Sequence, residues 1–358
     1  MKKINRRTYW ICCAATMFLS ISLNASAESD DSGPVHRPLF DDDSTLAITI
    51  EGPLNTVMRN RDETEEFPAL FKFLNADGTE TTLDIKLRVR GKFRRKRETC
   101  NFAPLRVNFK KSQLEGTVFA GQNTIKLVTD CQSGKKAYKQ YLLKEYLAYK
   151  FLNVLTDRSF NARLLRVTYV DTDRKGKSRE TFAFFIEEKN HIADRLGMDR
   201  LKMPKTKYSA LDPAHTNLVN VYEYFIANTD YSLVLGPKGA DCCHNAVLYQ
   251  KDSAPILTIP YDFDHAGLVN APYASPNPKF KIKSVTNRIY RGRCANNSHL
   301  EATFKMFLDN KDALTKAVTE LDGYDERSIK GTMRLIDGFY KDITTPKNVE
   351  RRFVKKCS

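Results

Sequence analysis

Three short polar motifs in the second half of the chain carry the residue types that phosphoryl transfer requires. They are Asn228-Thr-Asp230, His244-Asn245 and Tyr261-Asp-Phe-Asp-His265, and the last two adjoin predicted strands. Phosphoryl transfer needs an acid that orients the acceptor hydroxyl, and hard oxygen ligands that hold Mg²⁺ on the phosphates. A carboxylate, an amide and a second carboxylate at successive strand–loop junctions provide that set. Each motif alone is more often a turn or a cap, so the hypothesis rests on their order along the chain.

A strongly basic segment in the first half could contact phosphates. Residues 88–97 read Arg-Val-Arg-Gly-Lys-Phe-Arg-Arg-Lys-Arg, and a predicted strand enters this segment at Gly91. Glycine permits a tight turn there, and the cationic side chains could close over phosphate oxygens. Taken alone, the segment is also consistent with a solvated basic loop.

Hydrophobic periodicity places these motifs on a framework of strands and helices. Alternation is strict at Leu83, Ile85, Leu87 and Val89, which predicts a strand with one buried face. The first half is predicted to form strands, one helix and two further strands, at residues 46–50, 69–91 (a hairpin), 104–109, 124–128, 138–155 (the helix), 164–170 and 181–186. The second half is predicted to form a helix, two short strands and two closing helices, at residues 218–227, 246–249, 256–259, 302–321 and 328–342.

From about residue 83 to 267 the chain resembles the CotH kinase family, named for a spore coat protein, and more broadly atypical protein kinases. The similarity rests on Arg90-Gly91 after a strand, Thr124-Ile-Lys126-Leu-Val and the helix around Lys144-Glu145. It continues through the Asn228-Thr-Asp230 loop, Asn245 and Ile259-Pro-Tyr-Asp262-Phe-Asp264. The resemblance implies an α+β fold, a two-lobed protein-kinase-like domain with an antiparallel-sheet small lobe and a mainly helical large lobe.

The resemblance also implies a site that binds ATP with Mg²⁺ or Mn²⁺. Lys126 would hold the phosphates and pair with Glu145 of the helix, while Glu187 and Glu188 would lie at the hinge near the adenine. Asp230 would be the catalytic acid. The implied nucleotide-binding residues are Arg90, Gly91, Lys126, Glu145, Glu187 and Glu188, and the implied metal ligands are Asn245, Asp262 and Asp264.

Departures from ordinary kinases leave alternatives open. The chain has no regular glycine-rich phosphate loop, no His-Arg-Asp precedes Asp230, and 14 residues separate Asp230 from Asn245. An exported atypical kinase that phosphorylates a protein or envelope acceptor is the first hypothesis. A catalytically inactive kinase-like scaffold of the cell envelope is the second, because fold does not dictate function. Nucleotidyl transfer onto protein hydroxyls is a third.

The N-terminus reads as a cleavable secretory signal. Four basic residues precede a mostly apolar run of 15 residues that ends at Ala25-Ser26-Ala27. An uncleaved anchor is less consistent with this run, because spanning a bilayer takes about 20 apolar residues. We therefore expect an exported protein, periplasmic or extracellular, without a transmembrane segment after cleavage. The predicted organisation is a signal peptide at 1–27, a flexible N-terminus at 28–44, a β-rich small lobe at 45–190 and a mostly helical lobe at 191–358.

Charge favours anionic partners. The chain carries a net charge of +15, and +11 remains once the four basic residues of the predicted signal are set aside. Such an excess favours nucleotide phosphates, acidic proteins or an anionic envelope surface. We expect no nucleic-acid partner, because no nucleic-acid-binding signature is present.

Cysteine number predicts disulfide bonds. Six cysteines follow the predicted signal, an even set that an oxidising compartment would pair. We expect Cys100 to pair with Cys131, and the other four cysteines to lie in the second half without a specified pairing. Zinc at Cys242-Cys243-His244 is disfavoured, because adjacent cysteines have poor chelate spacing.

Overall fold

The computed structural model describes residues 35–358, so the predicted signal peptide at 1–27 lies outside the described residues. Residues 35–358 belong to one compact unit. Near its start, Leu39 is fully buried and Asp42 lies 2.8 Å from Arg163. The proposed boundary between residues 190 and 191 remains a prediction.

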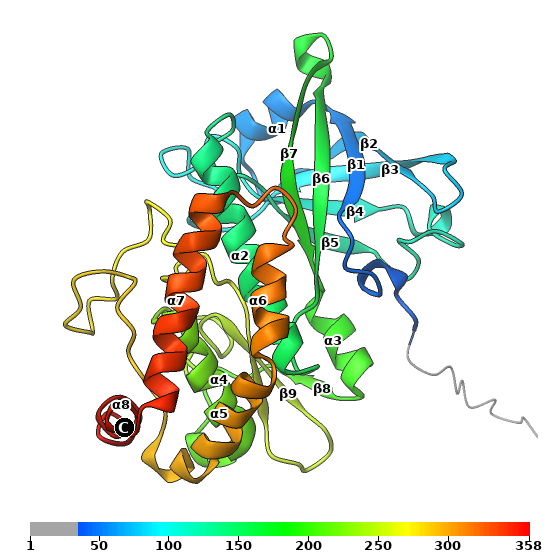
Figure 1. Ribbon diagram of the computed structural model, residues 1–358. Coiled ribbons are helices and arrows are strands. Elements are labelled where there is room, and N and C mark those ends of the chain that lie inside the picture. The colour runs from blue at the N-terminus through cyan, green and yellow to red at the C-terminus, as the bar shows by residue number, and fades with distance from the viewer. Residues whose placement is uncertain (1–34) are drawn as a thin grey trace, which may run out of the picture. The chain divides into compact units, whose positions relative to one another are not determined.

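Seven strands of the first half close into a barrel (Figure 1). Each predicted strand of this half is present. Alternating burial explains the strands, since Leu83, Ile85, Leu87 and Val89 are each at most 3 % exposed and point into the barrel core with their neighbours. The order around the barrel is β1 (Leu46–Gly52), β2 (Phe67–Leu74), β3 (Glu80–Val89), β4 (Leu105–Phe109), β5 (Thr124–Val128), β7 (Lys177–Ile186) and β6 (Ala162–Asp171).

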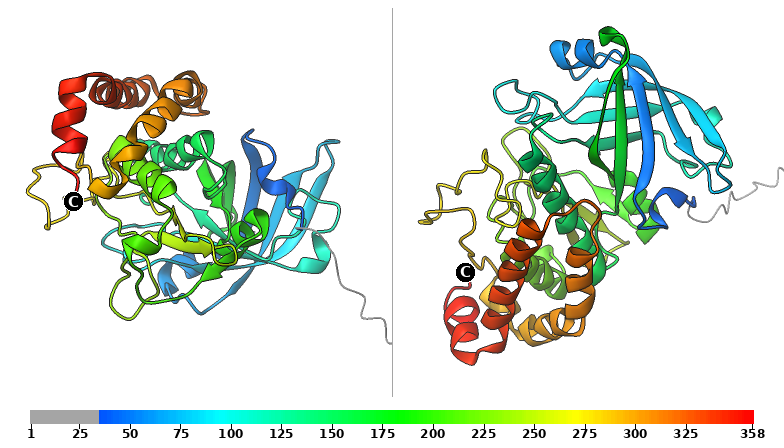
Figure 2. Two further views of the ribbon diagram at one scale, coloured as in Figure 1. Left: turned by 90° about the horizontal axis from the view of Figure 1, so that it is seen from below. Right: turned by 45° about the horizontal axis from the view of Figure 1, so that its top comes forward.

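The barrel closes through a parallel pair between the first strand and the sixth. Leu46 lies opposite Leu165 and Gly52 opposite Asp171, and the two strands lie side by side in Figures 1 and 2. All other neighbouring strands of the barrel are antiparallel. The predicted two-lobed kinase-like fold, with an antiparallel sheet in its small lobe, is therefore wrong. The strands themselves were expected, but the parallel contact converts them into a closed mixed barrel.

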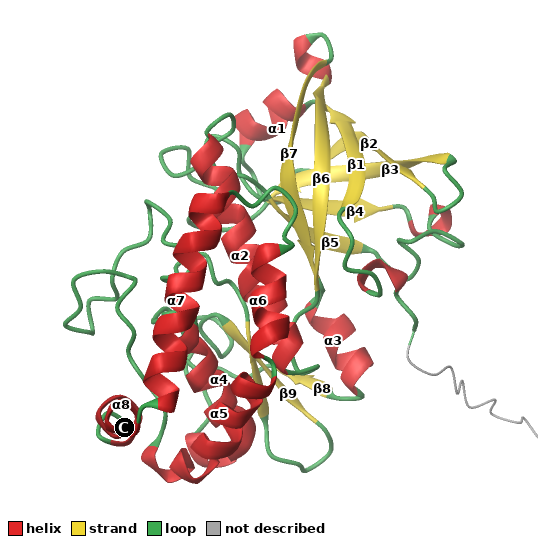
Figure 3. Cartoon of the chain, in the orientation of Figure 1, coloured by secondary structure: helices red, strands yellow, loops and turns green. Residues whose placement is uncertain are grey.

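A small antiparallel sheet and most of the helices follow the barrel in the chain (Figure 3). The sheet has the order β10 (Leu257–Pro260), β9 (Ala246–Gln250) and β8 (Asp199–Leu201). The α-helices of the described residues are α1 (Leu54–Asn60), α2 (Lys136–Leu155), α3 (Lys189–Leu196), α4 (Pro213–Phe225), α5 (Leu300–Asp309), α6 (Lys311–Thr319), α7 (Glu326–Thr344) and α8 (Pro346–Val349).

Helix α2 links the barrel to the helical region. The apolar stripe that its helical spacing predicts is fully buried at Leu143, Leu147 and Phe151 and partly buried at Val154. This stripe belongs to a second hydrophobic core that also contains the inner faces of α4, α5, α6 and α7. Helix α2 is buried around much of its circumference, because strands of the barrel cover one side and the helices of this core cover the other.

Three disulfide bonds are present within residues 35–358. Cys100 pairs with Cys131, as expected, and Cys294 pairs with Cys357. The adjacent Cys242 and Cys243 are bonded to each other, so neither thiol is free to bind zinc. No helix within residues 35–358 combines the length and the apolar character needed to cross a membrane.

Candidate functional site

A polar cleft of about 600 Å³ brings most of the predicted site residues together. It is lined by the basic loop after β3, by β5, by the start of α3, by the loop between α4 and β9, and by the segment after β10. Arg90, Gly91, Lys126, Asp230, Asn245, Asp262 and Asp264 all lie in its wall. These residues come from segments up to 174 positions apart, so the fold and not the local sequence assembles the site.

Asp230, His244 and Asn245 form one hydrogen-bonded group. His244 Nε2 lies 2.8 Å from Asp230 Oδ1, while Asn245 Nδ2 donates to the backbone oxygen of Asp230 at 2.7 Å and to its Oδ2 at 3.2 Å. Burial raises the pKa of Asp230, but the hydrogen bonds from His244 and Asn245 and the neighbouring His244 and His265 together outweigh burial and lower this pKa. The hydrogen bond with Asp230 raises the pKa of His244. The group therefore presents an ionised carboxylate, held in place on both oxygens, to the cleft.

Arg94 connects three carboxylates at the back of the cleft. Its Nη1 and Nη2 donate to the two oxygens of Glu145 at 2.8 and 3.1 Å. Its Nε lies 3.2 Å from Asp264, and Nη2 lies 3.6 Å from Asp262. Burial raises the pKa of Glu145, and the charge of Arg94 opposes that rise. Because Arg94 and Glu145 are both buried, this bidentate pair anchors the basic loop to α2.

Lys126 carries a buried amino group without a hydrogen-bond partner among the described residues. Burial is the main cause that lowers the pKa of Lys126 to about 7. Two other residues of the cleft wall, Arg90 and Arg200, each have a buried Nε atom. Neither Nε atom has a hydrogen-bond partner among the described residues. Buried polar groups in proteins are almost always paired, so three unpartnered nitrogen atoms of basic side chains in the wall of one cavity are unusual.

Asp262 is the most accessible acid of the motif after β10. Its side chain is 44 % exposed, whereas that of Asp264 is 8 % exposed. The backbone of Asp262 has a positive φ of 63°, and its amide donates to the hydroxyl of Tyr149 at 2.9 Å. A left-handed backbone is uncommon for a residue other than glycine, and such residues cluster at functional sites. Asp262 is therefore the carboxylate best placed to contact a ligand in the cleft.

Several predicted site residues lie elsewhere or make other contacts. The expected ion pair between Lys126 and Glu145 does not form, because Arg94 occupies the Glu145 carboxylate. Glu187 is buried and binds Arg195 and the backbone amide of Asn161. Glu188 lies 3.4 Å from Arg106. Neither Glu187 nor Glu188 belongs to the cleft wall, whereas Gly91, with a φ of 91°, makes the turn into the basic loop.

Sequence reasoning did not find two cations of the cleft. Lys189 begins α3 and lies 3.2 Å from the Tyr261 hydroxyl, and Arg200 lies on β8. Both follow the residues that the resemblance assigned to the nucleotide hinge. No local pattern distinguishes them from other surface cations, because only the packing of α3 and β8 beside β9 brings them to the cleft.

The residues suit a phosphate-bound metal better than an all-protein metal site. No group of three or more His, Cys, Asp or Glu side chains able to hold a metal occurs within residues 35–358. Mg²⁺, however, commonly binds through one or two carboxylates together with substrate phosphates and waters. Asp262 and Asp264 fit that smaller requirement, while Asn245 is engaged with Asp230 through its amide nitrogen.

Compared with protein-family models and with curated proteins, the chain matches none.

Proposed function

We propose that the cleft binds the phosphates of ATP and transfers a phosphoryl group to a hydroxyl acceptor. The observation that carries this proposal is the set of unpartnered buried cationic atoms, Arg90 Nε, Lys126 Nζ and Arg200 Nε, at one cavity. A polyphosphate supplies the acceptor oxygens that these donors lack. The resemblance to CotH kinases points to the same ligand class.

The acids of the cleft complement this anion site. Asp262, assisted by Asp264, would hold Mg²⁺ or Mn²⁺ against the phosphate oxygens, where the cation would neutralise charge. The exposed carboxylate of Asp262 lies next to Arg94, so the two residues together present one negative and one positive group to the ligand. A complex of a metal cation with phosphates needs both kinds of group, because the carboxylate binds the cation and the guanidinium binds phosphate oxygens.

Asp230 is placed to handle the proton of the acceptor. In the proposed reaction the acceptor oxygen forms a bond to the γ-phosphorus, the bond from that phosphorus to the bridging oxygen breaks, and ADP leaves. The acceptor proton passes to Asp230, whose orientation is fixed by His244 and Asn245. His244 acts here as a positioning residue, since it contacts Asp230 at 2.8 Å.

One observation favours binding without transfer as a second candidate function. Arg94 already engages Glu145, Asp264 and Asp262, and Lys126 lacks the carboxylate partner that an active kinase would give it. A cleft arranged in this way could hold an anionic ligand of the envelope and leave it unchanged. In either case the acceptor or ligand would be a protein or an envelope component that an exported, basic protein meets.

Radiolabelled ATP separates these functions. The oxidised protein would be incubated with Mg²⁺ or Mn²⁺ and ATP labelled at the γ- or the α-phosphorus, with protein labelling and phosphate release as readouts. Phosphoryl transfer predicts signal from the γ-label only, and its loss in Asp230→Asn. Asp252→Asn is the control, because Asp252 is an exposed aspartate that lies outside the cleft. Signal from the α-label would show nucleotidyl transfer, and binding without either signal would favour the second candidate.

A further inference from the structure

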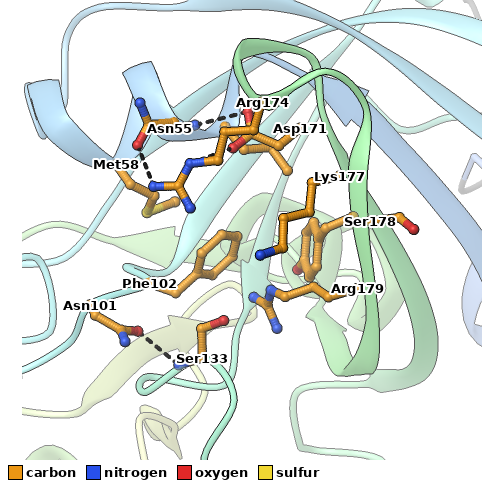
Figure 4. Close-up of a pocket in the computed structure, with 12 residues that line it drawn as sticks. Asn55, Met58, Asn101, Phe102, Ser133, Asp171, Arg174, Lys177, Ser178 and Arg179 are labelled. Carbon is orange, nitrogen blue, oxygen red and sulfur yellow. Dashed lines mark hydrogen bonds and ion pairs between the residues drawn. The ribbon is translucent and has the colours of Figure 1, made fainter.

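A second pocket lies on the barrel, away from the cleft, between α1 and the hairpin of β6 and β7 (Figure 4). Its volume is about 360 Å³, within the range of small-molecule sites. Residues from α1, from the loop around the Cys100–Cys131 disulfide and from the hairpin line its wall. The two pockets share no lining residue.

Three basic side chains of the hairpin converge on this pocket. Figure 4 shows Arg174, Lys177 and Arg179 around the ring of Phe102. Arg179 is held by Asp130 at 3.0 Å, and Arg174 by Asn55 at 2.8 Å and by Asp171 at 3.6 Å. Lys177 has no ion-pair or side-chain hydrogen-bond partner among the described residues. The two fixed guanidinium groups and the free amino group therefore leave an excess of positive charge.

The floor of the pocket is aromatic. The guanidinium of Arg179 lies 4.3 Å from the Phe102 ring centre and 4.7 Å from that of Tyr169, and the two rings are 4.9 Å apart. Tyr169 is 1 % exposed, and its hydroxyl has no hydrogen-bond partner within residues 35–358. An unpartnered buried hydroxyl is rare in folded proteins, and a bound polar ligand would account for it.

We propose that this pocket binds a small phosphomonoester that carries an apolar or aromatic body. The dianionic phosphate would lie among Arg174, Lys177 and Arg179, because guanidinium and ammonium groups bind phosphate oxygens through charge-assisted hydrogen bonds. The apolar body would pack against Phe102 and the neighbouring side chain of Met58. Asp171, the acid in the wall, is turned toward Arg174 and toward the backbone amides of Asn55 and Asp173. This proposal stands independently of the function proposed for the cleft.

Calorimetric titration of the full, oxidised protein with phenyl phosphate tests this site. Benzoate and inorganic phosphate serve as comparison probes that each lack one half of the proposed ligand. Phenyl phosphate should bind more tightly than either, and Lys177→Gln should weaken it about tenfold or more. Lys175→Gln is the matched control, since it removes a charge from the same hairpin outside the pocket. Lys126→Met should leave the affinity unchanged, because Lys126 belongs to the cleft.

Three results would overturn the proposal. The first is the absence of phenyl phosphate binding at about 10 mM, a concentration that would nearly saturate a site with a Kd of about 1 mM. The second is equal affinity in the wild type and Lys177→Gln. The third is loss of binding in Lys126→Met with retention in Lys177→Gln, which would move the site to the cleft. Lys177 is exposed, so its substitution should leave the thermal unfolding midpoint unchanged and the comparison valid.

Discussion

Arg94 and Glu145 form a buried bidentate ion pair that joins the basic loop of the barrel to helix α2, with distances of 2.8 and 3.1 Å. The same guanidinium reaches Asp264 at 3.2 Å. Removal of one partner from a buried pair leaves a charge without compensation, which typically costs about 3–5 kcal/mol of stability. Arg94 is therefore one of the contacts that hold the loop over the cleft, together with the hydrogen bond from Arg61 to the Arg95 backbone oxygen and the Cys100–Cys131 disulfide.

Arg94→Met should lower the free energy of unfolding by about 3–5 kcal/mol in urea titration, because Glu145 and Asp264 would stay buried without their cation. The double variant Arg94→Met/Glu145→Met should lose less than the sum of the single variants. Arg95→Met is the control, because its ion pair with Glu63 at 3.6 Å is partly exposed, and it should change stability by less than about 1 kcal/mol. Equal effects of Arg94→Met and Arg95→Met would contradict the anchoring role.

Lys126 should take up a proton when a phosphate ligand binds above neutral pH. Its pKa of about 7 in the free protein means that the amino group is largely neutral at pH 8, and an adjacent anion favours the charged form. Calorimetry of ATP binding at pH 8, in buffers of different ionisation enthalpy, should therefore show proton uptake. The uptake should vanish in Lys126→Met and at pH 5.5, where Lys126 is already charged. Proton release or no exchange at pH 8 would argue against phosphate binding at Lys126.

His244 should affect transfer more than nucleotide binding. It orients Asp230, and proton transfer by a positioned side chain typically contributes about 10²–10⁴-fold to the rate, which sets the upper limit of the loss expected without His244. His244→Asn should therefore lower the γ-phosphate transfer rate while changing the Kd for ATP little. Asp230→Asn/His244→Asn should be no slower than Asp230→Asn alone, because the two residues act as one unit. The acidic limb of the pH–rate profile should move to higher pH in His244→Asn, since His244 lowers the pKa of Asp230. An unchanged profile would assign His244 a purely structural role.

Glu223 should make the free energy of unfolding fall as the pH rises. It is 1 % exposed, both carboxylate oxygens lack a partner among the described residues, and burial raises its pKa to about 8. The nearby Asn228 opposes the shift without forming a hydrogen bond of good geometry. Because the pKa of Glu223 is higher in the folded state than in the unfolded state, this residue stabilises the folded protein fully below its unfolded-state pKa, near 4.5. That stabilisation is lost as the pH rises through about 8.

Unfolding titrations at pH 5, 6, 7 and 8 check this effect. Between the two pKa values the free energy of unfolding should fall by roughly 1.4 kcal/mol per pH unit through this residue. Glu223→Gln should remove that part of the slope, whereas Glu320→Gln, on an exposed ion pair with Lys316, should leave it intact. Identical slopes in the wild type and Glu223→Gln would show that Glu223 does not titrate in this range.

Local structure could be predicted from the sequence because it depends on neighbouring residues. The alternation from Leu83 to Val89 gave a strand, and the stripe from Leu143 to Phe151 gave a helix. Helix α4 begins earlier than expected, although Asp212 followed by Pro213 is a start signal, and the Asp212 carboxylate does accept a hydrogen bond from the His215 amide. The predicted helix over residues 302–321 is divided at Asn310 into α5 and α6.

Tertiary pairing could not be predicted in the same way. The contact between Leu46 and Leu165 that closes the barrel joins segments more than 100 residues apart, and no alternation pattern names a partner strand. The partner of Glu145 was misassigned for a similar reason. Residues 88–97 hold several arginines with equivalent local context, and only the fold selects Arg94. Two candidate acids, Asp230 in the loop after α4 and Asp262 directly after β10, did come together. Asn245 precedes β9, which pairs with β10, and its side chain holds Asp230 beside them.

The most direct test of the central claim is a thermal-shift titration of the oxidised protein with ATP, with and without Mg²⁺ or Mn²⁺. A ligand that binds only the folded state at 100 times its Kd stabilises it by about 2.7 kcal/mol. We predict a metal-dependent rise in the unfolding midpoint that is lost in Lys126→Met and Asp262→Ala. Lys111→Met, which removes an exposed charge outside the cleft, should retain it. No rise at millimolar ATP, or an equal rise in Lys126→Met, would contradict a nucleotide site in this cleft.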